Sequence, residues 1–201
     1  MVVAILAHVQ RICDAIEVRD VHRRFRFVLG TIAIEECAKG MAFLLYSCHV
    51  LSPEEMAQAY RRGGPLQDHR FRQKMAAAFL SSLELLVKTR PIPKPLPHYA
   101  AMNAARHVAE RIHRDSDLRR ALDPAAWRDW EWRKQQALYV DWYENSGIPG
   151  DPVRSEDMAA VRRVARQYLL ILRSAASSPQ RRAIERHGAE FRALLHLDDL
   201  K

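Results

Sequence analysis

The longest apolar stretch of the 201-residue chain begins near Phe25 and fades near His49 and Val50. An α-helix has about 3.6 residues per turn, and with this period the apolar side chains of the stretch fall on nearly every side of the helix. The helix therefore has no continuous polar face. A helix of this kind is usually buried in the middle of its domain. We therefore expect one long central helix here, capped at its start by Asp20, with the other helices packed around it.

Apolar stripes and helix-start signals predict the remaining elements. Residues 3–18 form a first amphipathic helix, and Ser52 followed by Pro53 begins a short helix that ends at Gly63. Further helices are predicted at residues 69–88, 98–113, 125–138, 155–175 and 178–196, the first of them capped by Asp68. No run alternates apolar and polar residues over the length of a strand. The predicted fold class is an all-α helical bundle, formed as a single domain over residues 1–201.

Two segments interrupt this helical pattern. Residues 89–97 contain four prolines, which remove backbone donors and fix backbone angles, so we expect a rigid Pro-rich connector across the surface. Residues 141–153 are rich in glycine and proline and are predicted to form a Gly/Pro loop. Both segments are expected to join helices of the same domain.

Composition narrows the class of protein. Hydrophobic residues make up 48% of the chain and charged residues 28%, which is typical of a globular protein with a substantial core. The net charge of +8 favours phosphate backbones or anionic surfaces as partners, although an arginine-rich surface is also common in proteins from GC-rich genomes. The three cysteines, an odd number without metal-ligand spacing, are expected to be buried free thiols in a reducing compartment. No signal peptide and no membrane-spanning stretch is recognised, so we expect a cytoplasmic protein without membrane contact.

Charged residues lie at the centre of the apolar helix, where Glu35, Glu36 and Lys39 follow one another closely. Ionised groups are rarely buried unless they are paired, because removing them from water costs several kcal/mol. One interpretation is a Glu35–Lys39 pair at i,i+4 on the rim of the bundle. The other is a polar site set into the core, where perturbed functional groups tend to lie.

A second cluster, residues 69–74, places His69 among cations at the start of a predicted helix. Helix N-terminal amides favour anions, and a histidine beside arginines can act as a neutral general base near pH 7. A solvated basic helix end is the structural alternative.

A third cluster of polar residues covers residues 133–141. Arg-x4–6-His spacings also occur, and they are Arg62 to His69, Arg106 to His113 and Arg182 to His187.

Metal and cofactor chemistry finds little support in the pattern. Glu110 and His113 have the Glu-x-x-His spacing of di-iron bundles, but the second copy that such sites need is missing. The chain also has no Gly-rich phosphate loop, no serine nucleophile elbow and no Cys-x-x-Cys pair. We therefore expect no metal site and no cofactor.

Three motifs, taken together, resemble a known family. They are A-I-E-E-C-A-K-G at residues 33–40, H-R-F-R at residues 69–72, and K-Q-Q-A-L-Y-V-D-W at residues 134–142, followed by the Gly/Pro loop to Pro152. Their order and approximate separation are similar to those of the AbiV-family abortive infection proteins, over about three fifths of the chain. Cys37-Ala38 and the arginines in place of lysines depart from the family pattern. Arginine keeps the charge but is planar and bidentate.

The resemblance implies a helical protein related to the HEPN superfamily, with an up-and-down core of four to five helices and extra short helices. It implies a role in bacterial defence against phages, and many HEPN proteins are dimeric, metal-independent endoribonucleases that use an Arg-x4–6-His motif. RNA, a phage-encoded protein and a second copy of the chain are the expected partners. The candidate catalytic residues are His69 as base, Arg70 and Arg72 on phosphate, Glu36 and Lys39 as orienting groups, and Tyr139 and Asp141 from the later loop. Candidate RNA or phosphate contacts are Lys74, Lys134, Arg106 and His113.

Non-catalytic functions remain open on the same residues. The polar clusters are equally suited to a network that locks the helices together or to a dimer seam. An interaction protein that binds a phage or host factor is supported by a density of aromatic side chains typical of partner sites. These residues are Trp127, Trp130, Trp132, Trp142 and Tyr143. A helical RNA-binding module without turnover is a third hypothesis.

Overall fold

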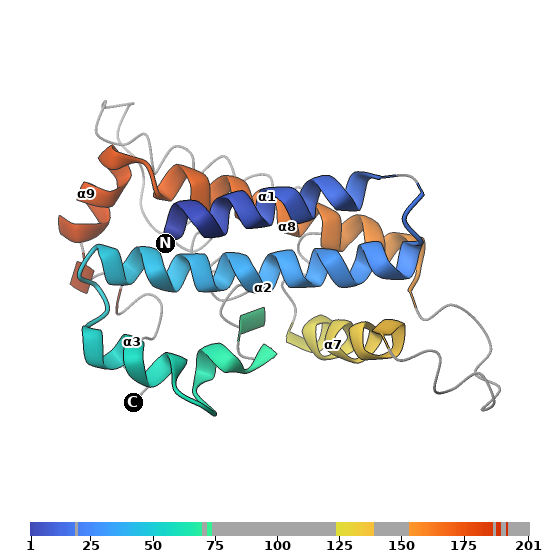
Figure 1. Ribbon diagram of the computed structural model, residues 1–201, viewed down its shortest axis with the longest axis horizontal. Helices are drawn as coiled ribbons and strands as arrows, with labels where there is room; N and C mark the ends of the chain where they lie inside the picture. The colour runs from blue at the N-terminus through green and yellow to red at the C-terminus, as the bar shows by residue number, and fades with distance from the viewer. Residues whose placement is uncertain are drawn as a thin grey trace.

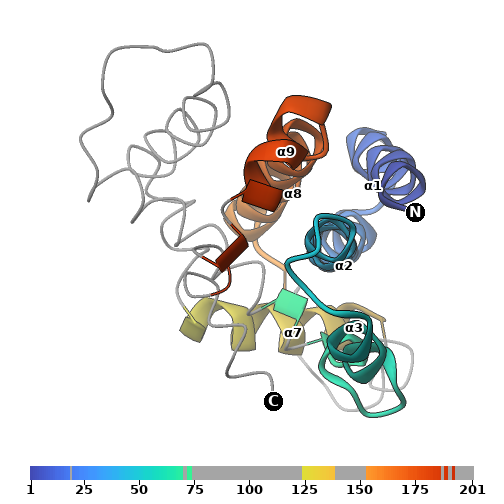
Figure 2. The same cartoon turned by 90° about the vertical axis from the view of Figure 1, so that its left-hand side faces the viewer.

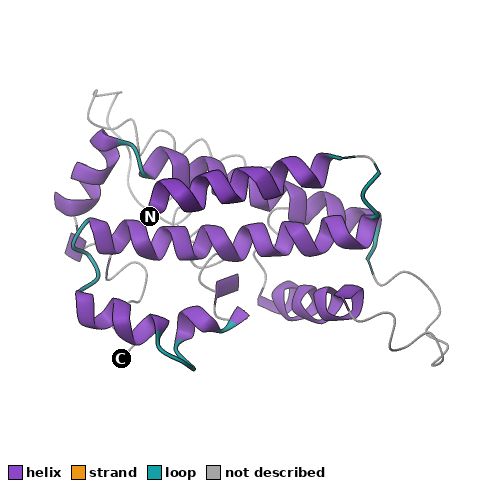
Figure 3. Cartoon of the chain, in the orientation of Figure 1, coloured by secondary structure: helices purple, strands orange, loops and turns teal. Residues whose placement is uncertain are grey.

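The computed structural model describes residues 1–18, 20–69, 72–73, 124–138, 153–186, 188–189 and 192. Within these ranges every regular element is helical and no strand occurs (Figure 3), which confirms the predicted all-α bundle. The helices, labelled as in Figure 1, are α1 (Val2–Glu17), α2 (Arg23–Ser47), α3 (Pro53–Tyr60), α7 (Pro124–Leu138), α8 (Ser155–Ala175) and α9 (Ser178–Arg186). A short 3-10 helix, η1, spans Pro65–Gln67.

Helix α2 is the central element of the bundle. It contacts α1, α8, α7 and α3, and the end-on view in Figure 2 shows it between α1 and α8 on one side and α7 and α3 on the other. It runs antiparallel to α1 and parallel to α8 (Figure 1), with Gly30 and Gly40 of α2 facing Val161 and Leu172 of α8 in the same order. Its buried residues cover most of the helix circumference, as the apolar pattern predicted, whereas Ile32, Glu36 and Phe43 on the remaining side are only partly buried. Phe25 near its start is 57% exposed.

Gly30 allows α2 and α8 to approach closely. A Cβ atom at this position would lie only 2.2 Å from Cγ1 of Val161, which is fully buried on α8. Because no side chain larger than hydrogen fits at this distance, the two helices pack backbone against side chain at this point. This close contact at Gly30 sets the distance between α2 and α8 in the middle of the bundle.

Most predicted boundaries hold within a few residues. Helix α8 occupies the predicted residues 155–175, and α7 and α1 each begin one residue before the expected position. The Arg72 N–H donates to the Asp68 carbonyl, so a helical turn begins where it was predicted. The helix predicted at 98–113, the connector at 89–97 and residues 141–152 lie outside the described residues. No helix within the described ranges is long and apolar enough to cross a membrane.

Local capping explains two of the helix starts. At α3, the Glu55 N–H donates to the Ser52 hydroxyl and the Ser52 N–H donates to the Glu55 carboxylate, which is the predicted start stabilised by a reciprocal capping box. The helix ends at Tyr60, before the predicted end at Gly63. At α2, the cap predicted at Asp20 was wrong, because Nδ1 of His22 accepts from the Arg24 N–H at 3.4 Å and the helix begins after His22.

The C-terminal part of the chain is attached to the start of α3 by Arg192. Its guanidinium donates to both oxygens of Glu55, at 3.0 and 2.6 Å, and to the Val50 carbonyl at 2.7 Å. A bidentate pair of this kind adds geometric specificity to its energy. Arg192 therefore holds the C-terminal part of the chain against the turn between α2 and α3.

All three cysteines are buried free thiols, as predicted. Burial raises the pKa of the Cys13 thiol to about 11 and the pKa of Cys37 well above its usual value. Burial also raises the pKa of Cys48, although hydrogen bonds from Arg181 and Ser47 oppose this shift. All three are therefore thiols rather than thiolates at neutral pH.

His49, directly after α2, has a positive φ of 55°. This left-handed conformation costs an L-residue energy that glycine does not pay. We expect His49→Gly to raise the free energy of unfolding by about 0.5–1 kcal/mol, measured by urea denaturation. The exposed His8 within α1 provides the control, because His8→Gly is expected to lower stability by about 1 kcal/mol. A loss of stability in His49→Gly would contradict the conformational argument.

Candidate functional site

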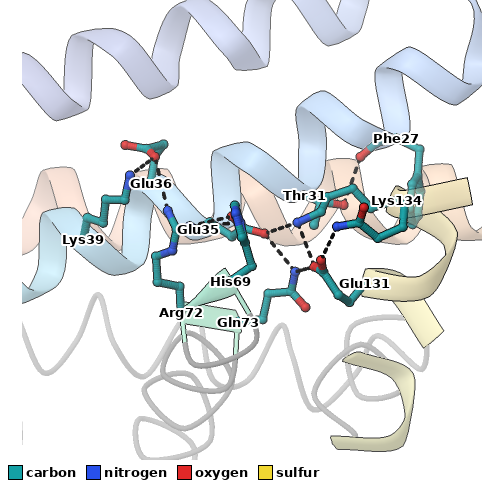
Figure 4. A network of polar contacts seen from close by, with 11 residues as sticks. Phe27, Thr31, Glu35, Glu36, Lys39, His69, Arg72, Gln73, Glu131 and Lys134 are labelled. Atoms are coloured by element: carbon teal, nitrogen blue, oxygen red, sulfur yellow. Dashed lines mark hydrogen bonds and ion pairs between the residues drawn. The ribbon is translucent and has the colours of Figure 1, made fainter. Parts of the chain in front are cut away.

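Glu35 is a charged residue in the most deeply buried part of α2, and its side chain is only 2% exposed. Residues 69–73 and helix α7 bring polar side chains to it from two other parts of the chain, as Figure 4 shows. The partners lie 34 to 99 positions away in the sequence. Of the two interpretations of these charges, the structure therefore agrees with the polar site set into the core, and Glu35 is at its centre.

The outer half of this site is a pair between Glu35 and His69. Nδ1 of His69 lies 2.6 Å from Oε2 of Glu35, and the histidine side chain is 53% exposed. An ionised carboxylate can only accept hydrogen bonds, so we assign the proton of a neutral His69 ring to Nδ1, facing Glu35. In this neutral tautomer the other ring nitrogen, Nε2, is unprotonated, and no described residue contacts it on the half-exposed ring.

Arg72 stands beside this pair. Its Nη2 lies 2.9 Å from Nδ1 of His69 and 3.5 Å from Oε2 of Glu35, and its Nη1 lies 3.7 Å from Glu36. A guanidinium has no acceptor, so it cannot receive the proton of Nδ1, and its favourable interactions are with the two carboxylates. Arg72 is 6% exposed and faces inward, which differs from the phosphate contact that we expected for it.

The inner half of the site joins α2 to α7. Nζ of Lys134 lies 2.8 Å from Oε1 of Glu35 and 2.7 Å from Oε2 of Glu131. Nε2 of Gln73 donates to the same two oxygen atoms, at 2.9 and 2.8 Å. Both acceptors are carboxylates, so the amide nitrogen rather than the oxygen of Gln73 must face them.

Glu131 is held in its ionised form by these contacts. Burial alone would raise the pKa of this carboxyl, but hydrogen bonds from Lys134 and Gln135 outweigh it and hold the pKa below its usual value. Lys134 is 3% exposed and enclosed by two carboxylates, which differs from the phosphate contact expected for it. Its ammonium stabilises the core of the site instead.

The side chain of Glu36 forms an ion pair within α2. It pairs with Lys39, which corrects the expected Glu35–Lys39 pair, because the i,i+3 rather than the i,i+4 neighbour of Lys39 is in reach. Burial first and the charge of Glu36 second raise the pKa of Tyr60 to about 12, with Arg72 opposing the shift. The carboxylate that orients His69 is therefore Glu35 rather than Glu36.

The structure thus brings together five of the residues selected from the sequence, namely Glu36, Lys39, His69, Arg72 and Lys134 (Figure 4). Six others lie outside the described residues, and these are Arg70, Lys74, Arg106, His113, Tyr139 and Asp141. The arginine in contact with His69 is Arg72, whereas the spacing argument had paired His69 with Arg62.

Glu35 was noted in the apolar helix, although Glu36 was the carboxylate selected as an orienting group. Two further members of the site, Gln73 and Glu131, were not selected from the sequence. The available signal was their helical spacing, since Glu131 precedes Lys134 by three positions and Gln73 follows His69 by four. Both residues lie in highly charged stretches, where such spacings are frequent and carry little information.

Without counting His69, the site contains equal numbers of carboxylates and cations. Three carboxylates face three cations, and these are Glu35, Glu36 and Glu131 with Lys39, Arg72 and Lys134. A neutral histidine with a free Nε2 is the form that a general base requires. The same contacts also cross-link α2, residues 69–73 and α7, so the network has a structural role as well.

Metal binding does not follow from this geometry. Within the described ranges no three histidine, cysteine or carboxylate side chains are arranged to hold a metal ion. The acids of the site are each paired with a cation instead.

Comparison with known proteins gives no match that would indicate the function of the site. No family model matches the chain, and neither a curated protein nor a solved structure matches it.

Proposed function

We propose that this chain is an endoribonuclease of bacterial phage defence that uses His69 as its general base. The observation that carries the proposal is the contact between Glu35 and Nδ1 of His69, which leaves Nε2 without a partner among the described residues, on a half-exposed ring. The resemblance of residues 33–40, 69–72 and 134–142 to AbiV-family proteins supports the defence role and a metal-independent reaction. The net charge of +8 supports a polyanionic substrate.

The proposed reaction uses the 2′-hydroxyl of the substrate itself. Nε2 of His69 takes the proton of a ribose 2′-OH, and the resulting oxygen attacks the adjacent phosphorus. The bond between phosphorus and O5′ breaks, and the released O5′ takes a proton from solvent. The products are a 2′,3′-cyclic phosphate and a 5′-hydroxyl. Glu35 stabilises the imidazolium that forms, because its carboxylate already faces Nδ1.

Replacement of His69 tests this proposal. We expect purified wild-type protein to cleave single-stranded RNA in the presence of EDTA, and His69→Ala to lose activity by about 100-fold or more. RNA that carries 2′-O-methyl groups should not be cleaved by either protein. His8→Ala, which changes another exposed histidine, is the matched control and should retain full activity.

The outcome is decisive only for folded proteins, so circular dichroism should show equal helix content in all variants. Cleavage by His69→Ala at the wild-type rate, or cleavage of 2′-O-methyl RNA, would contradict the proposed mechanism. Persistent growth arrest in cells that express His69→Ala would contradict the biological role.

A non-catalytic interaction protein is the second candidate, and the observation that favours it is Trp132. This side chain is 56% exposed on α7, whereas Trp130 is buried and packs edge-on against Phe27 with ring centroids 6.4 Å apart. A large exposed indole is typical of an interface anchor for a phage or host factor. Growth arrest that is lost in Trp132→Ala and retained in His69→Ala would favour this function over RNA cleavage.

A further inference from the structure

We propose that Lys134 of α7 is a positioning residue for His69 and acts through Glu35. The proposal concerns the protonation of the histidine ring, and it rests on the proposed function only where RNA cleavage is used as a readout. Lys134 does not touch His69 in the contacts described above. Its influence has to pass through the carboxylate that both side chains share.

The two oxygens of Glu35 have different partners. Oε1 accepts from Lys134 at 2.8 Å and from Gln73 at 2.9 Å, whereas Oε2 faces His69 at 2.6 Å. Because the donors from α7 and residue 73 occupy Oε1, the carboxylate is turned so that Oε2 points to the histidine (Figure 4). Lys134 therefore fixes the rotation of the group that orients His69.

Lys134 also supplies a positive charge between two neighbouring carboxylates, Glu35 and Glu131. Gln73 donates from one nitrogen to both Glu35 and Glu131, so the two acids lie close together, and Lys134 is the cation that bridges them. Without this cation, like-charge repulsion favours the uptake of a proton by the pair. A protonated Glu35 offers an O–H to His69 and turns Nδ1 from donor into acceptor.

The consequence is a change of histidine tautomer. With Lys134 in place, the proton of neutral His69 is on Nδ1 and Nε2 is the base. Once Glu35 donates to Nδ1, the proton moves to Nε2, which can then no longer accept one. Besides Glu35, the charged groups of the described residues that face this histidine and its carboxylate are Arg72 and, from α7, Lys134. Of these, only Lys134 bridges Glu35 to Glu131 among the described contacts.

The test is the ¹⁵N NMR spectrum of the histidine rings at pH 7.5, with the His69 signals assigned by their absence in His69→Ala. We expect the Nδ1–H tautomer to predominate in the wild type and in Lys134→Arg. In Lys134→Met we expect the Nε2–H tautomer to predominate. Lys134→Gln keeps a hydrogen-bond donor without the charge, and it should also show the Nε2–H tautomer.

Arg133→Met is the matched control for loss of α7 docking. Arg133 is adjacent to Lys134 and pairs with Asp129 and with Asp157 of α8, so its loss loosens α7 without touching Glu35. This variant should keep the Nδ1–H tautomer. The proposal is overturned if a folded Lys134→Met or Lys134→Gln protein keeps it too, or if Arg133→Met loses it. Failure of both Lys134 variants to fold, with Arg133→Met folded, also overturns it, because Lys134 is then a structural residue.

The NMR readout separates this inference from the proposed function. A tautomer change in a protein that does not cleave RNA contradicts the proposed function alone. An unchanged tautomer in a protein that cleaves RNA through His69 contradicts the role of Lys134 alone. If both proposals hold, Lys134→Met loses RNA cleavage by about 100-fold, like His69→Ala, and Lys134→Arg retains it.

Discussion

Glu35→Ala is expected to lower the free energy of unfolding by about 3 kcal/mol, because removing one partner of a buried ionic network leaves the other charges uncompensated. The side chain is 2% exposed and holds contacts to Lys134, Gln73 and His69. Alanine leaves three cations facing two carboxylates and a space where the side chain was. Urea denaturation followed by circular dichroism measures the loss.

Glu36→Ala is the matched control for this change. It alters the next residue of the same helix in the same way, but Glu36 is 18% exposed and pairs with Lys39 close to solvent. Its loss should cost less, about 1 kcal/mol, because its pair with Lys39 is partly open to solvent and its contact with Arg72, at 3.7 Å, is long. Equal losses of stability in the two variants would contradict the claim that the burial of Glu35 makes its contribution to stability larger than that of Glu36.

Gly30→Ala is expected to lower the free energy of unfolding by about 2 kcal/mol, since overpacking of a core costs more than the helix propensity of alanine returns. The new Cβ would lie 2.2 Å from Cγ1 of Val161, a stiff β-branched side chain that is fully buried. Either α2 or α8 has to shift to make room for this atom. Thermal or urea unfolding measures the resulting loss of stability.

Two further variants check the cause. Gly188→Ala introduces the same methyl group where the nearest atom of the described residues, Cγ2 of Val50, is 3.5 Å away, so stability should not fall. Val161→Ala removes the clashing methyl group, and the double variant Gly30→Ala/Val161→Ala should be more stable than the sum of the two single losses implies. Strictly additive losses would contradict a direct clash.

The fold was predictable where the signal is local. The burial of α2 follows from its apolar residues, and the start of α3 follows from Ser52, Pro53 and Glu55, which lie within four positions of one another. The start of α2 was less predictable, because Asp20 and His22 both offer acceptors and only the path of the chain decides between them.

The sequence indicated most of the segments that contribute to the site, but it did not indicate which side chains contact one another. Glu35 and Glu36 are adjacent on a helix that is apolar on all sides, so the pattern cannot tell which of them faces the partner segments. The decisive contact of Glu35 is with Lys134, 99 positions later, and it depends on where α7 docks. His69 was selected for its cationic neighbours, but the carboxylate that orients it could only be identified from the packed structure.

The state of the cysteines has a practical consequence for experiments on this protein. Cys13, Cys37 and Cys48 are enclosed and protonated, and a maleimide reagent needs both access and a thiolate. A cysteine introduced at an exposed position such as His8 would therefore react far faster than the native three. A fluorophore or spin label can be attached there without first removing the natural cysteines, which leaves the packing around α2 intact.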